Sequence, residues 1–331
     1  MRAHRKAIAA ISAAVALAGI AVGMFVISRP GPPAAARHPA ARVIRPQLLS
    51  PFTGEPVASL GAVIAVKVDN IRQARPQTGL SRADIVYVIP VEGGLTRFMA
   101  IFSSRFPPVI GPVRSAREDD LELLRQFGRP AFAYSGAQPQ LLPVVEHADI
   151  VDLYSGLVGG YYRVDTRVAP YNLYAHTAQL RAEAKGASRA HDIGFRFGPP
   201  PAGGRPTASE SVSYPAASFT FSWSAARGRW MIKMDGSPAL TTDGGQLSAA
   251  TVVIQYTIVR KSRFIEWGAL PPYAESTGSG RAVVLRNGRA YQARWTRPAA
   301  ADGTVFTTAS GRMTFAPGPV WVLLTAAGAG R

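Results

Sequence analysis

The chain has 331 residues, 47% of them hydrophobic, and this length is enough for about two domains of ordinary size. It contains no cysteine, which excludes disulfide bonds, thiol nucleophiles, thiolate metal sites and lipid attachment at a cysteine. The formal net charge is +17, but seven basic and no acidic residues lie in residues 1–46, and no basic run interleaved with aromatic residues follows. We therefore do not expect nucleic-acid binding; the charge fits a basic surface that faces an anionic cell envelope.

The first 28 residues predict a membrane-targeting segment. Three basic residues precede an uncharged run at 7–27, and 21 residues would span about 32 Å as a helix, enough to cross a bilayer core. The charge before the run predicts that the rest of the chain lies outside the cytoplasm. Two alternatives remain open: an uncleaved signal anchor, which the length of the run favours, and a signal peptide cleaved at the alanines of 34–36, which would release a secreted protein.

Two Pro-rich segments divide the rest of the chain. Residues 29–50 contain five prolines and predict an extended tether between the membrane segment and the first domain. Residues 198–206, with three consecutive prolines and a Gly-Gly pair, predict a linker. The chain is therefore expected to hold a first domain at 51–197 and a second at 207–331.

The first domain mixes strands and helices. Apolar runs of strand length predict strands at 62–68, 84–91, 97–103, 131–135 and 150–154. A helix is predicted at 115–127, because Ser115 and Glu118 have capping-box spacing and Gly128 follows as a stop signal. Two more helices are predicted at 140–147 and 178–185, the second with Thr177 as its N-cap.

The second domain is predicted to be nearly all β. The expected strands lie at 218–223, 229–234, 251–259, 281–285, 290–295, 304–308, 313–316 and 320–325. Asn287-Gly288 is the strongest hairpin signal in the chain. The fold class is thus α+β: a mixed α/β N-terminal domain, then a mostly antiparallel C-terminal domain that forms a small sheet, sandwich or partial barrel.

Charged residues gather at the ends of the apolar runs of the first domain, next to Gly and Pro. The candidate ligand-binding residues are Lys67, Asp69, Asn70, Arg75, Glu92, Arg97, Arg114 and Arg117. Arginine presents a planar fork of donors to carboxylates and phosphates, so this set predicts a site for an anionic ligand. The alternative is an internal Arg–carboxylate network that locks the loops. Lys67 and Asp69 alternate on a strand and so share a face, which favours an ion pair or a turn-capping role for them.

Several of these motifs together resemble the YerB-like family of bacterial envelope proteins, many of them lipoproteins with a two-part domain of unknown function. The motifs are Lys67-Val68-Asp69-Asn70, Ala74-Arg75-Pro76-Gln77, Glu92-Gly93-Gly94, Gly111-Pro112-Val113-Arg114-Ser115-Ala116-Arg117, Val252-Val253-Ile254-Gln255 and Pro317-Gly318-Pro319-Val320-Trp321. The resemblance covers roughly residues 50–325. It implies an envelope location and a two-part architecture, and it implies no established activity.

The chain departs from this family at three points. The lipobox cysteine is missing, so an anchor here has to be the N-terminal segment itself. Val88 stands where the family commonly has Glu, and Tyr171 where it commonly has His. Acid–base chemistry at these two positions would be lost here, so contact or packing roles suit them better.

No recognised catalytic motif is present. A paired-carboxylate mechanism remains conceivable with Glu92 and Asp119 or Asp120, although the sequence fixes no separation between them. The histidines His147, His176 and His191 are too scattered for a metal motif, and no cofactor is expected.

The leading functional hypothesis is a membrane-tethered envelope protein that binds a cell-wall polymer or an envelope protein without catalysis of its own. The alternative is a cell-wall glycan or phosphate-ester hydrolase that uses Glu92 and Asp119 as acid and base.

Overall fold

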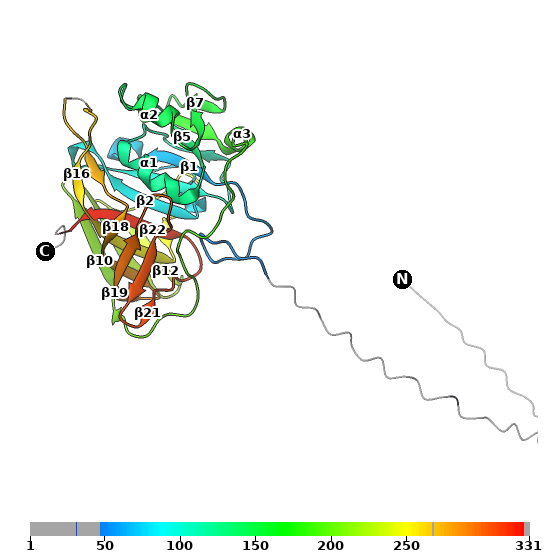
Figure 1. Cartoon of the computed structure of the whole chain (residues 1–331), viewed down its shortest axis with the longest axis vertical. Helices are drawn as coiled ribbons and strands as arrows, with labels where there is room; N and C mark the ends of the chain where they lie inside the picture. Colours follow the sequence, from blue (N-terminus) through cyan, green and yellow to red (C-terminus); the bar gives the residue numbers. More distant parts are fainter. Residues whose placement is uncertain (1–30, 32–46, 267, 328–331) are drawn as a thin grey trace, which may run out of the picture. The chain divides into compact units, whose positions relative to one another are not determined.

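The computed structural model describes residues 31, 47–266 and 268–327 (Figure 1). The predicted membrane segment at 1–28 and nearly all of the predicted tether lie outside the described residues. Within the described part, none of the helices has the length and apolar character that a membrane crossing requires. Pro46–Arg331 forms one compact unit.

One large sheet contains strands from both predicted domains (Figure 1). In the order in which they pair, its strands are β21 (Gly311–Arg312), β20 (Val305–Thr308), β19 (Arg289–Arg297), β18 (Gly278–Arg286), β15 (Thr251–Thr257), β22 (Val320–Ala326), β2 (Ile85–Pro90), β3 (Thr96–Phe102), β1 (Ile64–Asp69), β5 (Ala131–Tyr134) and β6 (Val151–Tyr154), with β9 (Arg205–Pro206) beside β19. The last strand, β22, lies between β15 and β2 and is parallel to both.

The position of β22 corrects the expectation that the second half closes on itself as a separate antiparallel sheet. All but the last residue of β22 are buried, as in central parallel strands that are covered on both faces. Such a strand buries more apolar surface between two neighbours than at the edge of a small sheet. The chain is therefore mostly β, its two parts joined through β22, and its three described α-helices are short.

The strand directions bring several strand ends to one edge of the sheet. Strand β3 is antiparallel to both β1 and β2, so these two strands run in the same direction. Because β5 is parallel to β1, and β22 and β15 are parallel to β2, the carboxyl ends of all five strands lie at this edge. Asp69 ends β1, Asn70 and Arg75 lie in the loop after it, and Glu92 lies in the turn after β2.

Further layers cover the two faces of the sheet. One face packs against a five-stranded sheet and a three-stranded sheet with its helix, and Phe98 meets both Phe219 and Trp321 there. These elements are β10 (Ser209–Tyr214), β11 (Ala217–Ser224), β12 (Arg229–Met234), β13 (Ser237–Pro238) and β14 (Ser248–Ala249), then β4 (Val109–Ile110), β7 (Tyr161–Arg163), β8 (Leu173–His176) and α3 (Thr177–Glu183).

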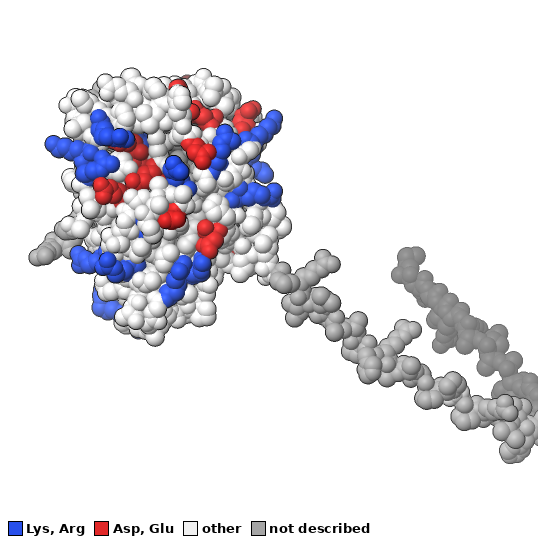
Figure 2. Space-filling model, viewed as in Figure 1, with Lys and Arg blue, Asp and Glu red and all other residues white. Residues whose placement is uncertain are grey.

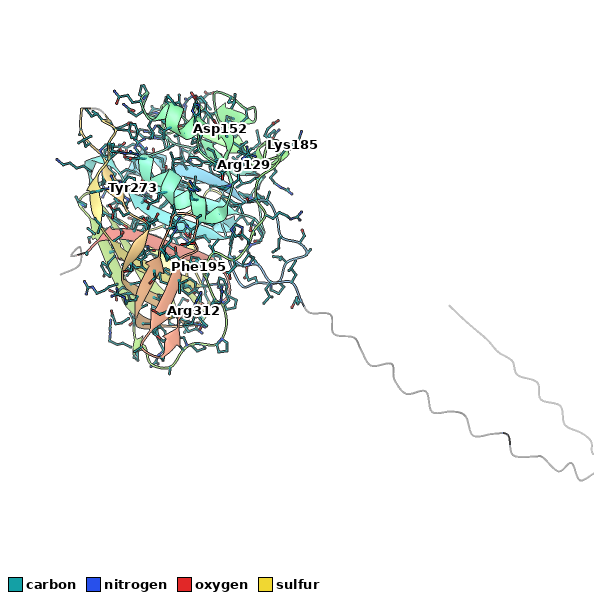
Figure 3. All side chains as sticks on the ribbon, in the orientation of Figure 1. Arg129, Asp152, Lys185, Phe195, Tyr273 and Arg312 are labelled. Atoms are coloured by element: carbon teal, nitrogen blue, oxygen red, sulfur yellow. The ribbon has the colours of Figure 1, made fainter. Side chains whose placement is uncertain are left out.

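The other face packs against α1 (Glu118–Leu124), its 3-10 extension Arg125–Phe127 and α2 (Leu142–Glu146), as Figure 1 shows for α1. A two-stranded hairpin, β16 (Val259–Lys261) and β17 (Pro272–Ala274), lies beside α1. Phe195, labelled in Figure 3, packs against Phe306 and Phe315 on this face.

All three helix starts differ from the prediction, and α2 begins at Leu142 rather than at residue 140. Helix α1 begins at Glu118 rather than Ser115, because the carboxylate of Asp120 accepts the backbone N–H of Arg117 at 2.7 Å and makes Arg117 the N-cap. Helix α3 begins at Thr177 itself, whose hydroxyl donates to the carbonyl of Pro107 instead of capping the helix.

The strand predictions for the second half hold with two exceptions. The hairpin at Asn287-Gly288 is confirmed, and both residues have the positive φ angles that such a turn requires. The predicted run 251–259 divides into β15 and the start of β16. No strand forms at 313–316, where Phe315 turns into an aromatic cluster; the hairpin partner of β20 is β21.

Candidate functional site

The candidate residues gather at the carboxyl edge of β1 and β2. Asp69 at the end of β1 lies opposite Arg97 at the start of β3, and Glu92 is the second residue after β2. Arg114 is placed beside β1 by its own backbone N–H, which donates to the carbonyl of Lys67 at 2.9 Å. The structure therefore brings residues from four separate segments to one edge, which the local sequence signals did not specify.

Glu92 is held by two buried arginines. Its Oε1 accepts from Arg97 Nη2 at 3.1 Å and from Arg117 Nη2, and its Oε2 accepts from Arg117 Nε at 3.0 Å. Arg117 also donates to Glu266 of the second half at 3.0 Å, and Arg97 donates to the carbonyl of Ser115 at 3.2 Å. The side chains of Arg97 and Arg117 are only 6% and 5% exposed.

Glu92, Arg97 and Arg117 form the Glu92 cluster, in which each charge shifts the pKa values of the others. Burial alone would raise the pKa of Glu92, but the hydrogen bond from Arg117 and the charges of both arginines hold it at about 2. Burial and repulsion by Arg117 lower the pKa of Arg97 to about 10. Burial works against the charge of Arg117 as well, yet Glu92 raises its pKa overall. The cluster thus matches the internal-network alternative: the donors of Arg97 and Arg117 already serve Glu92 and nearby carbonyls.

Arg114 is in a different situation. Its Nε donates to Asp69 Oδ2 at 2.7 Å, and its guanidinium lies 5.8 Å from the centre of the Tyr171 ring. Asp69 is fixed in turn by the backbone N–H of Asn70 at 2.8 Å. The side chain of Arg114 is 19% exposed, and neither Nη1 nor Nη2 has a hydrogen-bond partner among the described residues. Arg114 is therefore positioned while part of its donor fork stays open.

Lys67 has a structural partner. Its Nζ lies 2.5 Å from Asp120 Oδ1, and both side chains are fully buried. Lys67 does share a face with Asp69, but its ion pair is with Asp120 of α1 rather than with Asp69. Since Asp120 also accepts the N–H of Arg117, this pair fixes the start of α1 against the sheet.

Asn70 and Arg75 tie together the loop after β1. Asn70 donates to Thr96 Oγ1 at 2.8 Å, and Arg75 donates to the carbonyl of Asn70 at 2.7 Å. Arg75 also pairs with Asp235 of the second half at 2.8 Å. Sequence reasoning passed over Gln77, although it stands in one of the family motifs; it is fully buried and donates to Asn70 Oδ1.

The acidic residues of α1 bind the β16–β17 hairpin and the segment after it. Tyr273 of β17, labelled in Figure 3, lies on the side of the molecule that carries α1. The pairs are Glu118 with Ser262 Oγ (2.7 Å) and Arg263 Nε (2.5 Å), Asp119 with Ala274 N (3.1 Å), and Glu122 with Tyr273 Oη (2.9 Å) and Ser276 N (2.7 Å). These residues hold the two halves together.

The carboxylates proposed for a hydrolase do not form a catalytic pair. Glu92 lines a pocket between the two halves, whereas Asp119 is only 3% exposed at the start of α1. Burial and the neighbouring charge of Asp120 raise the pKa of Asp119 to about 7. In the described part of the chain, no group of three His, Cys, Asp or Glu side chains is placed to hold a metal ion.

The two positions that depart from the family pattern have packing or contact roles here. Val88 is fully buried in the core between the large sheet and the five-stranded sheet. The ring of Tyr171 lies under the guanidinium of Arg114, 5.8 Å from ring centre to Cζ.

Comparison with known proteins identifies the family. Residues 52–190 match the N-terminal domain, and residues 211–322 the C-terminal domain, of the protein family of unknown function DUF3048. The chain belongs to this family, which confirms the resemblance to YerB-like proteins seen in the sequence.

Two comparisons concern one relative from Bacillus subtilis. The protein described as “Putative lipoprotein YerB” is 38% identical over 148 residues, which are 42% of this chain and 44% of that relative, so the alignment spans less than half of its length. The crystal structure of YerB has the same fold, with a TM-score of 0.72 and 24% identity over 85% of this chain and 97% of that one.

Proposed function

We propose that this chain is an extracytoplasmic envelope protein that its N-terminal segment directs to or holds at the membrane, and that it binds an anionic group of a wall polymer or a partner protein at Arg114. The location is supported by the uncharged run at 7–27 and by a relative described as a lipoprotein. Fractionation of cells tests it: we expect the protein in the membrane fraction if the segment is an anchor and in the medium if it is cleaved. Recovery in the cytoplasm would contradict the proposal.

The open guanidinium of Arg114 is the observation that carries the binding proposal. Asp69 and Tyr171 hold the side chain in place, so a ligand does not have to order it, and two nitrogens point donors to whatever approaches. A carboxylate or phosphate can accept both, which is the geometry for which arginine is best suited. Arg97 and Arg117 are buried, and both terminal nitrogens of each already donate to Glu92, Glu266 or a backbone carbonyl, so they act as supports.

The test is calorimetric titration of the mature protein with muropeptides, teichoic acid fragments and polyphosphate. We expect saturable binding of one of these classes and at least tenfold weaker binding by Arg114→Ala, because hydrogen bonds to charged groups contribute roughly 1.5–3 kcal/mol. Arg114→Lys should recover only part of it, since it keeps the charge without the fork.

Arg129→Ala is the matched control, because Arg129 is half exposed and pairs loosely with Asp149 at 3.7 Å. It should bind as the unchanged protein does. Equal binding by the Arg114→Ala protein, or no binding of any anion, would overturn the proposed site.

No observation favours the other two functions. The hydrolase lacks a convergent carboxylate pair, as described above. Nucleic-acid binding would require a continuous basic surface. On the face seen in Figure 2, acidic and basic side chains are instead interspersed.

A further inference from the structure

Two arginines lie directly opposite each other on β18 and β19, which are neighbours in the large sheet (Figure 1). Arg281 of β18 pairs in register with Arg294 of β19, and both residues are exposed. Residues paired in this way share a face of the sheet, with Cβ atoms about 4.5–5.5 Å apart, and like charges in such a pair are destabilising. The sheet therefore holds two positive charges together on its surface at a cost to its own stability.

No acidic side chain offsets these two charges. None of the ion pairs between described residues includes Arg281 or Arg294. Arg294 makes one long hydrogen bond, to the hydroxyl of Ser279 at 3.4 Å. Arg281 lies with its guanidinium 5.4 Å from the centre of the Tyr256 ring, a contact that uses none of its N–H donors. Unlike the arginines that hold Glu92, this pair keeps its charge and most of its donors for a ligand.

Both arginines line a pocket of about 400 Å³ at the β20 end of the sheet. Thr307 of β20 pairs with Arg294 on the side away from Arg281, so the three residues form one row across three strands. Gln292 lies two residues before Arg294 on the same face of β19. Gln292 and Thr307 are exposed and line the pocket too, whereas no acidic residue is among the described residues that line it.

This arrangement favours a ligand that carries two negative charges on one small group. Guanidinium groups bind carboxylates and phosphates alike, but a carboxylate brings a single charge. A phosphate monoester carries about −1.5 to −2 charges at pH 7 and has three strong acceptor oxygens. These oxygens can accept from Arg281 and Arg294 at once and from the hydroxyl of Thr307. A phosphodiester has lost one of the charges and one of the free oxygens, so it complements the pair less well.

We propose that the pocket at Arg281 and Arg294 binds a phosphate monoester group in its dianionic form, held between the two guanidinium groups. The bound charge would offset the repulsion that the sheet otherwise carries at this position. This site is separate from Arg114, which lies beside β1, because β15, β22, β2 and β3 come between β18 and β1 in the sheet. It does not depend on the binding proposed there.

The probe is glycerol 3-phosphate, titrated at pH 8 and constant ionic strength into the 15N-labelled mature protein and followed by NMR. We expect saturable shifts of the backbone amide signals of Arg281, Arg294 and Thr307, which locate the binding. Dimethyl phosphate, a diester with one charge, should bind about tenfold more weakly. Arg281→Gln and Arg294→Gln should each weaken the binding of glycerol 3-phosphate by about tenfold or more, because each removes hydrogen bonds to a charged group.

Arg289→Gln is the matched control, since Arg289 is an exposed arginine of the same strand that lies on the opposite face of the sheet from Arg294. It should leave the binding unchanged, as should Arg114→Ala, and melting temperatures in phosphate-free buffer check that every variant is folded. Absence of a saturable shift at these amides, equally tight binding of dimethyl phosphate, or unchanged binding by either the Arg281→Gln or the Arg294→Gln protein would each overturn the proposal.

Discussion

Glu92 and Asp119 are two carboxylates near α1 that the fold treats in opposite ways. Each oxygen of Glu92 accepts from an arginine, and its pKa falls to about 2. Asp119 accepts one backbone N–H, its Oδ1 has no partner among the described residues, and its pKa rises to about 7. Burial penalises both charges, so the difference comes from the donors supplied and from the neighbouring charge of Asp120, which raises the pKa of Asp119 further. Ionised Glu92 strengthens the fold, whereas ionised Asp119 weakens it.

Stability should therefore depend on pH in two opposite ways. For Glu92, whose folded pKa lies below its ordinary value of 4.5, the contribution is present above pH 4.5 and is lost as the pH falls toward 2. For Asp119 the folded protein binds the proton more tightly than the unfolded chain, so stability falls as the pH rises from about 4 to about 7.

The largest effect is expected from removing the cation of the buried Lys67–Asp120 pair. Lys67→Met leaves Asp120 buried without its charge partner and should lower the free energy of unfolding by about 3–5 kcal/mol, measured by urea denaturation. Lys67→Met combined with Asp120→Asn should lose clearly less, because no charge is then stranded and the amide oxygen of the new side chain can still accept the N–H of Arg117. Equal losses in the single and double variants would show that packing, rather than charge, dominates here.

Removing one arginine from the Glu92 cluster should have the next largest effect. Arg117→Ala leaves Glu92 with Arg97 alone and breaks the link to Glu266, so we expect a loss of about 2–3 kcal/mol. The pKa of Glu92, followed by NMR, should rise from about 2 toward its ordinary value. The surface pair of Arg129 serves as the reference, with a loss below about 0.5 kcal/mol for Arg129→Ala. Similar losses in the two variants would mean that the cluster is not a structural lock.

Neutralising Asp119 should act in the opposite direction. Asp119→Asn keeps the size and one acceptor oxygen for Ala274 N–H but removes the buried charge. We expect it to flatten the fall in stability between about pH 4 and pH 7 and to stabilise the protein at pH 8 by about 1–2 kcal/mol. Melting temperatures over pH 4–8 measure this slope. An unchanged slope would assign the pH dependence to other groups.

The contrast between local and long-range signals explains what the sequence could predict. Strands such as β1 and β2 are clear because their apolar runs have strand length, and Asn287-Gly288 specifies its hairpin through positive φ angles. The insertion of β22 between β2 and β15 leaves no local mark, because a buried apolar strand does not indicate its neighbours. For the same reason the charged residues of the site were found, while their partners were not. Glu266 comes from the other half of the chain, and Lys67 pairs with α1.

Among the residues of the site, the smallest effect on stability is expected at Arg114, and this small effect distinguishes Arg114 from Arg117. The side chain of Arg114 makes one hydrogen bond, to Asp69, and keeps two nitrogens open at a partly exposed position, so its loss should cost less than about 1 kcal/mol. Asp69 retains the N–H of Asn70, which limits the penalty for the carboxylate that remains. Arg114→Ala in urea denaturation, beside the titrations proposed above, should therefore remove anion binding with little change in stability. A loss as large as that of Arg117→Ala would make Arg114 part of the same internal network and leave no arginine of this edge for a ligand.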